Sequence, residues 1–243
     1  QIDSEICRAT TGDKLNMISN ANRITVWGRR NSMNVQKVMW TLGELGLDYQ
    51  RNDMAGSFGV DDQYTAKNPN AVVPTIEDGE LTLYESNACV RYLARQYGTG
   101  SLCPSNLKDA ALADQWMDWQ CSTFGSGFFM IFMNKIRVPA EKSSQDQITK
   151  GEQQTARLLQ QLETKLEQTD YLVGNTLTMA DIPIGAMLYR YFMMEIERPS
   201  VPAVSAYYQR LTARPEYQKH VMIPFGRNSD EWLSEEQRNA GLQ

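Results

Sequence analysis

One change in the spacing of apolar residues constrains the fold of this chain more than any other feature. Over residues 23–99, short β-rich runs such as Ile24–Trp27 alternate with helical spacing, and Asp78-Gly79 is a hairpin turn signal. The order β-α-β-α-β-β-α indicates a parallel crossover followed by a hairpin. After a linker of residues 100–106, residues 107–226 show helical spacing alone. The sequence therefore predicts an α/β domain followed by an all-α domain.

The helical part carries local signals of its own. Residues 107–134 form one long segment rich in Trp, Phe and Met, interrupted by Gly125 and Gly127. A glycine inside a helix is unfavourable by about 1 kcal/mol relative to alanine, so we expect these two to leave room for a ligand or a neighbouring helix. Thr178 to Asp181, placed before an apolar run, indicates a capping box with Asp in place of the usual Glu or Gln.

Two polar stretches flank these domains. Residues 1–22 show no periodicity, and Met17 would make a natural translation start. We therefore expect residues 1–22 to be a tag or an upstream leader. Residues 227–243 are polar as well, and we expect them to form a frayed tail.

Composition excludes several classes of partner. The net charge is −5 and no block of like charges occurs, so neither nucleic acid nor an anionic membrane is an expected partner. No apolar run reaches the roughly 18 residues of a transmembrane helix. With a single histidine, His220, and no CxxC pair, a metal site is not expected. The four scattered cysteines are typical of reduced thiols in a cytoplasmic protein: Cys7, Cys89, Cys103 and Cys121.

The junction between the first strand and the first helix carries a polar run, Asn31-Ser32-Met33-Asn34. A helix that begins here offers unpaired N–H groups and the positive end of its dipole to an anion. Ser32 has two interpretations, because a serine at this place either caps the helix or donates its hydroxyl hydrogen to a ligand. No cysteine lies in this junction, so a cysteine nucleophile is not expected there.

Three segments in this order resemble the cytosolic glutathione transferase superfamily. They are Asn68 to Thr75, Leu83 to Ala88 and Gly174 to Asp181, and the resemblance covers Ile24 to about Gly226. It is strongest for bacterial members related to the serine-using and Nu-like classes. The resemblance implies a thioredoxin-like first domain, an all-helical second domain, glutathione as co-substrate, and a homodimer.

The resemblance also implies roles for individual residues. Ser32 matches the catalytic hydroxyl that stabilises the glutathione thiolate, and Asn34 matches a second polar contact used in Nu-like members. Val73-Pro74 matches the segment with a cis proline, where the main chain of Val73 pairs with the cysteinyl part of glutathione.

The γ-glutamyl end of glutathione carries one carboxylate and one ammonium. By the same resemblance, Ser86 and the following N–H groups suit the carboxylate, and Glu85 suits the ammonium. The glycyl carboxylate has no clear partner, because Ala71 and Val72 stand where some members carry a basic or amide side chain. The open candidates are Lys67, Asn70, Arg29 and Arg30.

The second substrate is expected between the domains, against the first helix of the all-α domain. Trp119, Phe124 and Phe128 are the predicted lining residues. At helical spacing the aromatic residues of this helix cannot all face one way, so most of them are expected to be core or dimer interface. A hydrophobic electrophile is the default substrate.

Three functions stay open at this point. The first is conjugation of glutathione to an electrophile. The second is glutathione-dependent reduction of a disulfide or peroxide by the same fold. The third is a non-catalytic binding or assembly module. The presence of Ser32, Val73-Pro74 and Glu85-Ser86 together favours an enzyme.

Overall fold

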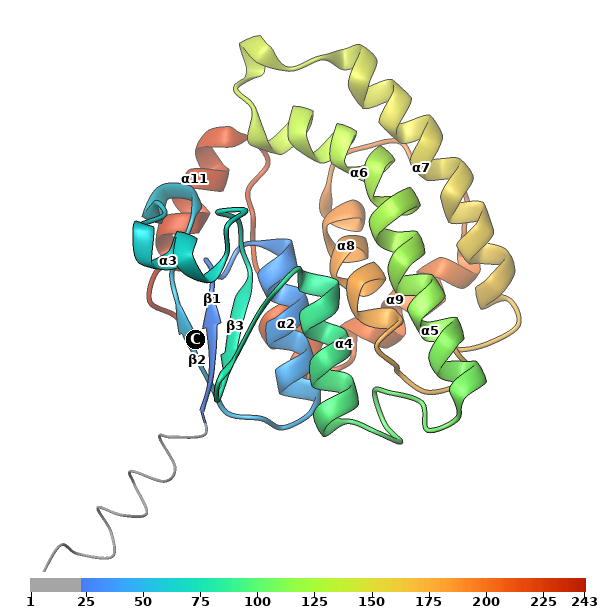
Figure 1. Cartoon of the computed structure of the whole chain (residues 1–243). Coiled ribbons are helices and arrows are strands. Elements are labelled where there is room, and N and C mark those ends of the chain that lie inside the picture. Colours follow the sequence, from blue (N-terminus) through green and yellow to red (C-terminus); the bar gives the residue numbers. More distant parts are fainter. Residues whose placement is uncertain (1–22) are drawn as a thin grey trace, which may run out of the picture.

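The computed structural model describes residues 23–243, so the expected leader lies outside the described residues. The first domain has the predicted order and includes one 3₁₀ turn, η1 (Gly56–Phe58). The strands form one sheet in the order β2-β1-β3-β4, with β2 parallel to β1 and the other neighbours antiparallel (Figure 1). Its elements are β1 (Ile24–Trp27), α2 (Met33–Glu44), β2 (Tyr49–Asn52), α3 (Asp62–Lys67), β3 (Thr75–Asp78), β4 (Leu81–Tyr84) and α4 (Ser86–Tyr97).

Apolar alternation places this sheet against α2 and α4. Ile24 and Val26 of β1 are buried, as are Val38 of α2 and Leu93 of α4, and all four belong to one core cluster. Pro74 lies just before β3 rather than within it, so the strand loses no ladder donor. The predicted parallel crossover and hairpin are both present.

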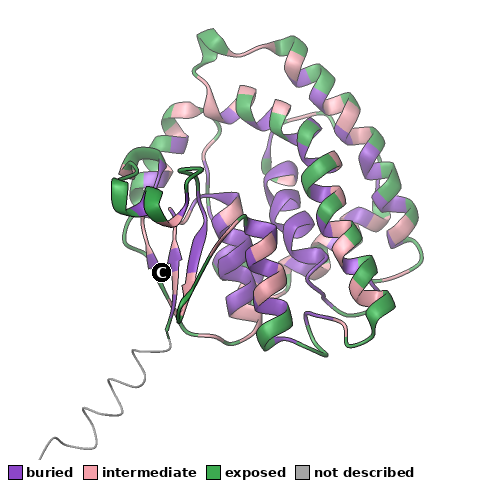
Figure 2. Ribbon diagram, in the orientation of Figure 1, coloured by how far each residue is buried: buried purple, intermediate pink, exposed green. Residues whose placement is uncertain are grey.

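The second domain is helical throughout. Its first segment is continuous but contains two π-helical turns, η2 (Gln120–Phe124) and η3 (Met133–Arg137). The helix α8 lies between α2 and the long helices, and it is buried on all sides for most of its length (Figures 1 and 2). The remaining elements are α5 (Leu107–Trp119), α6 (Gly125–Phe132), η4 (Ala140–Lys142), α7 (Gln145–Leu166), α8 (Asp181–Met193), α9 (Pro202–Thr212) and α10 (Pro215–His220).

Two expectations for these helices are resolved by their packing. A Cβ on Gly127 would lie 2.7 Å from Thr155 Oγ1, and one on Gly151 would lie 2.7 Å from Gly127 O. Gly127 therefore makes room for the neighbouring helix α7. At the start of α8, Asp181 accepts hydrogen bonds from the Thr178 N–H at 2.8 Å and from the Tyr207 hydroxyl at 2.9 Å, so the Asp181 half of the predicted capping box is present. The Thr178 hydroxyl accepts instead from the Ala180 N–H at 3.3 Å.

The helix α2 joins the two domains. A Cβ on Gly185 of α8 would lie 2.9 Å from the Trp40 ring of α2, so the two helices approach closely. At the other end, Arg190 of α8 donates to the Asn31 carbonyl at 2.5 Å, just before α2 begins. The first turn of α2 is therefore held at the boundary between the sheet and the helical domain.

The expectation of a frayed tail is wrong for residues 229–238, which form the helix α11 (Ser229–Arg238). Trp232 and Glu236 face inward and are 2% and 1% exposed. Glu236 forms an ion pair with Arg29 at 2.7 Å and accepts from the Ser57 N–H at 2.8 Å. The chain then returns to β2, where the Arg51 N–H donates to the Gln243 side chain (Figure 1). A sequence with one aromatic residue among polar ones does not reveal this docking.

Replacing Glu236 with Gln tests how tightly α11 holds the first domain. The change removes the negative partner of Arg29, whose side chain is only 11% exposed. Breaking a buried ion pair in this way should lower the free energy of unfolding by about 3 kcal/mol. The matched control is Glu231→Gln on the same helix, because the Arg227–Glu231 pair is exposed to solvent, which screens it, and its loss should change stability far less. Chemical denaturation of both variants measures the difference, and equal losses would contradict the docking of Glu236.

Candidate functional site

A cleft of about 220 Å³ lies between the two domains at the start of α2. The α/β domain supplies one wall, which we call the polar wall because it carries Ser32, Asn34 and the main chain of Val73, although several of its side chains are apolar. The helices supply an apolar wall with two arginines. The lining residues from the first domain are Arg29, Ser32, Met33, Asn34, Ala55, Ala71, Val72 and Val73. Those from the rest of the chain are Phe129, Phe132, Met133, Arg137, Arg190 and Trp232.

Ser32 occupies the N-cap position of α2, yet its hydroxyl caps nothing. Its backbone is extended, and its side chain forms no hydrogen bond to the first turn. The residue is 8% exposed and lines the cleft. Of the two interpretations of this serine, the structure disfavours the simple cap, because the hydroxyl hydrogen stays available to a ligand.

Val73 lies directly across the cleft from this turn. The Val73–Pro74 peptide is cis, as the resemblance implied, and no hydrogen bond within residues 23–243 uses the Val73 N–H or C=O. Gly28, at the end of β1, has φ +150°, and a Cβ there would lie 2.4 Å from Val35 and 3.0 Å from Val73. A glycine is therefore required for α2 and the Val73 loop to approach each other.

Ser86, at the start of α4, contacts both Asn34, which lines the cleft, and Lys37 of α2. Its hydroxyl donates to Asn34 Oδ1 at 3.2 Å and lies 3.3 Å from Lys37 Nζ. Lys37 also donates to Asn87 and Gln120, each at 3.2 Å. All three acceptors are neutral, and Lys37 is 3% exposed. The Lys37 ammonium thus lies next to Ser86 without an ion-pair partner within residues 23–243. Burial lowers its pKa to about 8.

Glu85 precedes this helix in an uncommon conformation. Its φ is +69°, which is unusual for a residue other than glycine, and its side chain is exposed. No hydrogen bond or ion pair within residues 23–243 engages its carboxylate. Ser32, Asn34 and Val73 line the cavity itself. Ser86 reaches it through its hydrogen bond to Asn34, and neither Ser86 nor Glu85 lines the cavity.

The structure does not bring the residues predicted for the second-substrate wall to the cleft. Phe124 and Phe128 are fully buried in the helical core, and Trp119 packs against that core. The apolar residues that line the cleft are Phe129, Phe132, Met133 and Trp232. The first three follow the spacing i, i+3, i+4, so they share one helix face, which adjoins the face of Phe128.

The arginines of the cleft differ in how their charges are balanced. Arg29 pairs with Glu236, whereas Arg190 donates only to the Asn31 carbonyl and, at 3.4 Å, to Gln36 Oε1. Arg137 lies over the Trp232 ring, 4.3 Å from its centroid. Sequence reasoning missed Arg137, Arg190 and Lys37, because they are single charged residues inside helical segments.

The other open candidates for the glycyl carboxylate lie elsewhere. Lys67 donates to Glu77 at 2.5 Å, and Arg30 donates to Asn239 at 2.8 Å. Asn70 is exposed and does not line the cleft. Arg29 alone of the four borders the cavity.

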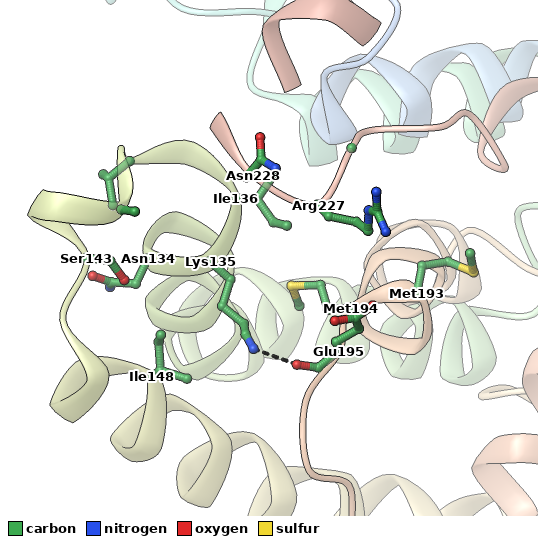
Figure 3. Close-up of a pocket in the computed structure, with 13 residues that line it drawn as sticks. Asn134, Lys135, Ile136, Ser143, Ile148, Met193, Met194, Glu195, Arg227 and Asn228 are labelled. Atoms are coloured by element: carbon green, nitrogen blue, oxygen red, sulfur yellow. Dashed lines mark hydrogen bonds between the residues drawn. The ribbon is translucent and has the colours of Figure 1, made fainter. Parts of the chain in front are cut away.

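Another cavity, of about 340 Å³, lies between η3 and the end of α8 (Figure 3). Lys135 projects into it and donates to the Glu195 carbonyl at 2.6 Å. Although it is larger than the cleft, none of the residues expected to bind glutathione lines it. This cavity is therefore not a better candidate for the glutathione site than the cleft at Ser32.

Residues 23–243 offer neither a membrane-spanning helix nor a metal centre. None of the described helices combines the length and the apolar character needed to cross a bilayer. The same residues contain no group of three or more His, Cys, Asp or Glu side chains placed to hold a metal ion.

Comparison with known proteins agrees with this geometry. Residues 22–95 match the family described as "Glutathione S-transferase, N-terminal domain", and residues 121–215 match "Glutathione S-transferase, C-terminal domain". Glutathione S-transferase GstB of Escherichia coli (strain K12) is 38% identical over 205 residues, which are 83% of this chain and 99% of that protein. The probable glutathione S-transferase GSTF1 of Oryza sativa subsp. japonica is 29% identical and covers 84% of this chain.

A solved structure is also similar. The theta class glutathione S-transferase of Xanthomonas axonopodis pv. citri, with glutathione bound, has 43% sequence identity and a TM-score of 0.81, and it covers 84% of this chain and 100% of its own. The chain therefore belongs to the glutathione S-transferase family. It is a glutathione transferase, and glutathione is its co-substrate.

Proposed function

We propose that the hydroxyl of Ser32 activates the glutathione thiol as a thiolate. The observation that carries the proposal is that this hydroxyl lines the cleft and caps no N–H group. A free thiol has a pKa of about 8.5, and only the thiolate is a good nucleophile. A hydroxyl donor beside the first turn of α2 lowers that pKa, because both the hydrogen bond and the helix dipole favour the anion.

The rest of the tripeptide follows the polar wall in this proposal. The cysteinyl unit pairs with the free main-chain N–H and C=O of Val73, as an added strand does. The γ-glutamyl carboxylate binds at Ser86 and the first turn of α4, where Lys37 adds a positive charge 3.3 Å from the serine oxygen. The exposed carboxylate of Glu85 pairs with the γ-glutamyl ammonium. Asn34 orients Ser86 through their hydrogen bond.

The reaction is then a nucleophilic substitution or addition. The thiolate attacks an electrophilic carbon that lies against the apolar wall of Phe129 and Met133, a carbon–sulfur bond forms, and a leaving group departs with its electron pair. Reduction of a disulfide or peroxide is the second candidate, since the same thiolate would serve it. The apolar residues across the cleft from Ser32 favour an electrophilic carbon compound.

Ser32→Ala tests the activation directly. Losing one donor to a developing anion reduces kcat by about 100-fold in comparable sites, so we expect a similar loss here with a small change in KM for glutathione. The thiol pKa of bound glutathione, followed by ultraviolet absorbance of the thiolate, should rise. Ser32→Thr keeps the hydroxyl and is the matched control. A thiolate signal that survives Ser32→Ala would show that another group stabilises the anion.

Lys37→Met tests the carboxylate subsite. Methionine keeps much of the side-chain length, and replacing a buried charge with an apolar group is often neutral for stability. We expect the affinity for S-methylglutathione at pH 7 to fall by about 10-fold, as befits one charge-assisted contact. Because the pKa of Lys37 is about 8, its ammonium loses its proton as pH rises through that value, so the two proteins should converge in affinity at higher pH.

Titration calorimetry measures both affinities, and Lys142→Met is the control at an exposed lysine of η4. Equal binding by Lys37→Met and the native protein at pH 7 would remove Lys37 from the subsite.

We further propose a homodimer that acts in the cytoplasm. Apolar side chains remain exposed on β4 and at the start of α5, with Leu107 84% and Leu112 46% exposed, and a second copy would cover them. Free thiols at Cys89, Cys103 and Cys121 agree with a reducing compartment. Sedimentation velocity should give twice the mass of one chain, and Leu107→Asp should shift the enzyme toward monomer. Cell fractionation locates the activity.

A further inference from the structure

Two guanidinium groups of the cleft form no ion pair within residues 23–243, although the charge of Glu236 acts on Arg137 from beyond ion-pair distance. Arg190 is 3% exposed, and its hydrogen bonds reach only neutral oxygens, those of Asn31 and Gln36. Its Nε is buried and has no hydrogen-bond partner within residues 23–243. Arg137 forms neither a hydrogen bond nor an ion pair within the same residues, and it rests on the face of Trp232. A buried charge without a partner is unfavourable, so its retention calls for an explanation.

The two cations also lie close to each other. Their guanidinium carbons are 4.3 Å and 5.5 Å from the centroid of the same Trp232 ring, so they are within about 10 Å of each other. The third arginine of the cleft, Arg29, is already neutralised by Glu236 at 2.7 Å. Burial, and then repulsion from Arg137 and Arg29, lowers the pKa of Arg190 to about 9. An anion placed between Arg137 and Arg190 would relieve this repulsion.

The position of the pair separates it from the γ-glutamyl end of glutathione. Arg137 belongs to η3 and Arg190 to α8, both in the helical domain, and they adjoin Phe129 and Met133 on the cleft wall. Lys37 and Ser86, at the far end of the polar wall, do not line this cavity. The free cations therefore lie on the helical side of the cleft, against which the electrophile is proposed to lie.

We propose that the second substrate is an anionic electrophile, a small apolar or aromatic body bearing a carboxylate that Arg137 and Arg190 hold together. The inference rests on the glutathione conjugation proposed above and specifies its acceptor. The body of the substrate lies against Phe129 and Met133. The thiolate attacks the electrophilic carbon, the carbon–sulfur bond forms, and a halide leaves with the electron pair of the broken bond. The carboxylate takes no part in bond making and serves to orient the carbon.

A matched pair of aryl chlorides tests the proposal on the full chain: 4-chloro-3-nitrobenzoate and its primary amide. Both lose chloride to a thiolate, and they differ in charge at one group. The native enzyme should show the higher kcat/KM with the acid. Arg137→Gln should lower kcat/KM for the acid by about 10- to 100-fold and leave the value for the amide within about threefold. Arg137→Lys should recover part of the activity with the acid, and Arg157→Gln, at an exposed arginine of α7, should change neither substrate.

A measurement that needs no turnover accompanies the kinetics. 3-Nitrobenzoate should inhibit the native enzyme competitively against the acid and lose that inhibition in Arg137→Gln, whereas 3-nitrobenzamide should inhibit both proteins alike. Circular dichroism and the activity with the amide show that the variant is folded.

Several outcomes would overturn the inference. If Arg137→Gln lowers kcat/KM equally for the acid and the amide and raises the thiol pKa of bound glutathione, the arginines stabilise the thiolate instead. A raised KM for glutathione with the amide as acceptor would assign them to the glycyl carboxylate. Turnover of the amide without any turnover of the acid leaves the transferase proposal intact and removes this one. Failure to bind glutathione at all would instead remove the proposed function.

Discussion

The hydrogen bond from Arg190 to the Asn31 carbonyl fixes the point on which the site depends. It ties a helix of the second domain to the residue before Ser32, over a distance of 2.5 Å. On the opposite side, Gly28 lets the loop of Val73 approach the same turn of α2. The first turn of α2 is thus held from both domains, and a hydroxyl placed there is aimed at the cleft. Small shifts in this contact would move the hydroxyl away from its target.

The two walls of the cleft divide the work of recognition. The α/β domain provides hydrogen-bonding groups of fixed spacing, which suits a co-substrate of constant shape. The helical domain and α11 provide Phe129, Met133 and Trp232, together with the cations Arg137 and Arg190. Because side chains on a helix surface can change without disturbing the sheet, we propose that this wall selects the acceptor. Arg137 and Arg190 on this wall carry positive charge that no ion pair within residues 23–243 balances, and this charge is the feature that most directly suggests a class of acceptor.

Sequence patterns led to the cis Val73–Pro74 peptide and to Ser32, which line the cleft, but not to the apolar residues that line it. Val73-Pro74 and Ser86 are readable because their roles depend on a few adjacent residues and on the turn or helix start that these residues form. Phe124 and Phe128 were misplaced because a helix rotates its side chains by about 100° per residue, and the two π-helical turns change that phase. The helix α11 was missed because its inward residues are one aromatic and one glutamate, and the partner of that glutamate, Arg29, lies about 200 residues earlier.

By itself, the sequence determined the order of the elements, the division into two domains, the place of Ser32 at a helix start, and the absence of a cysteine there. These are consequences of local backbone preference and of apolar periodicity, which act over a few residues. Only the tertiary structure decided that the Ser32 hydroxyl caps no N–H group, that Lys37 lies beside Ser86, and that Arg137 and Arg190 both lie near the ring of Trp232. Those relations join residues far apart in the chain, and packing between domains, rather than any local preference, brings them together.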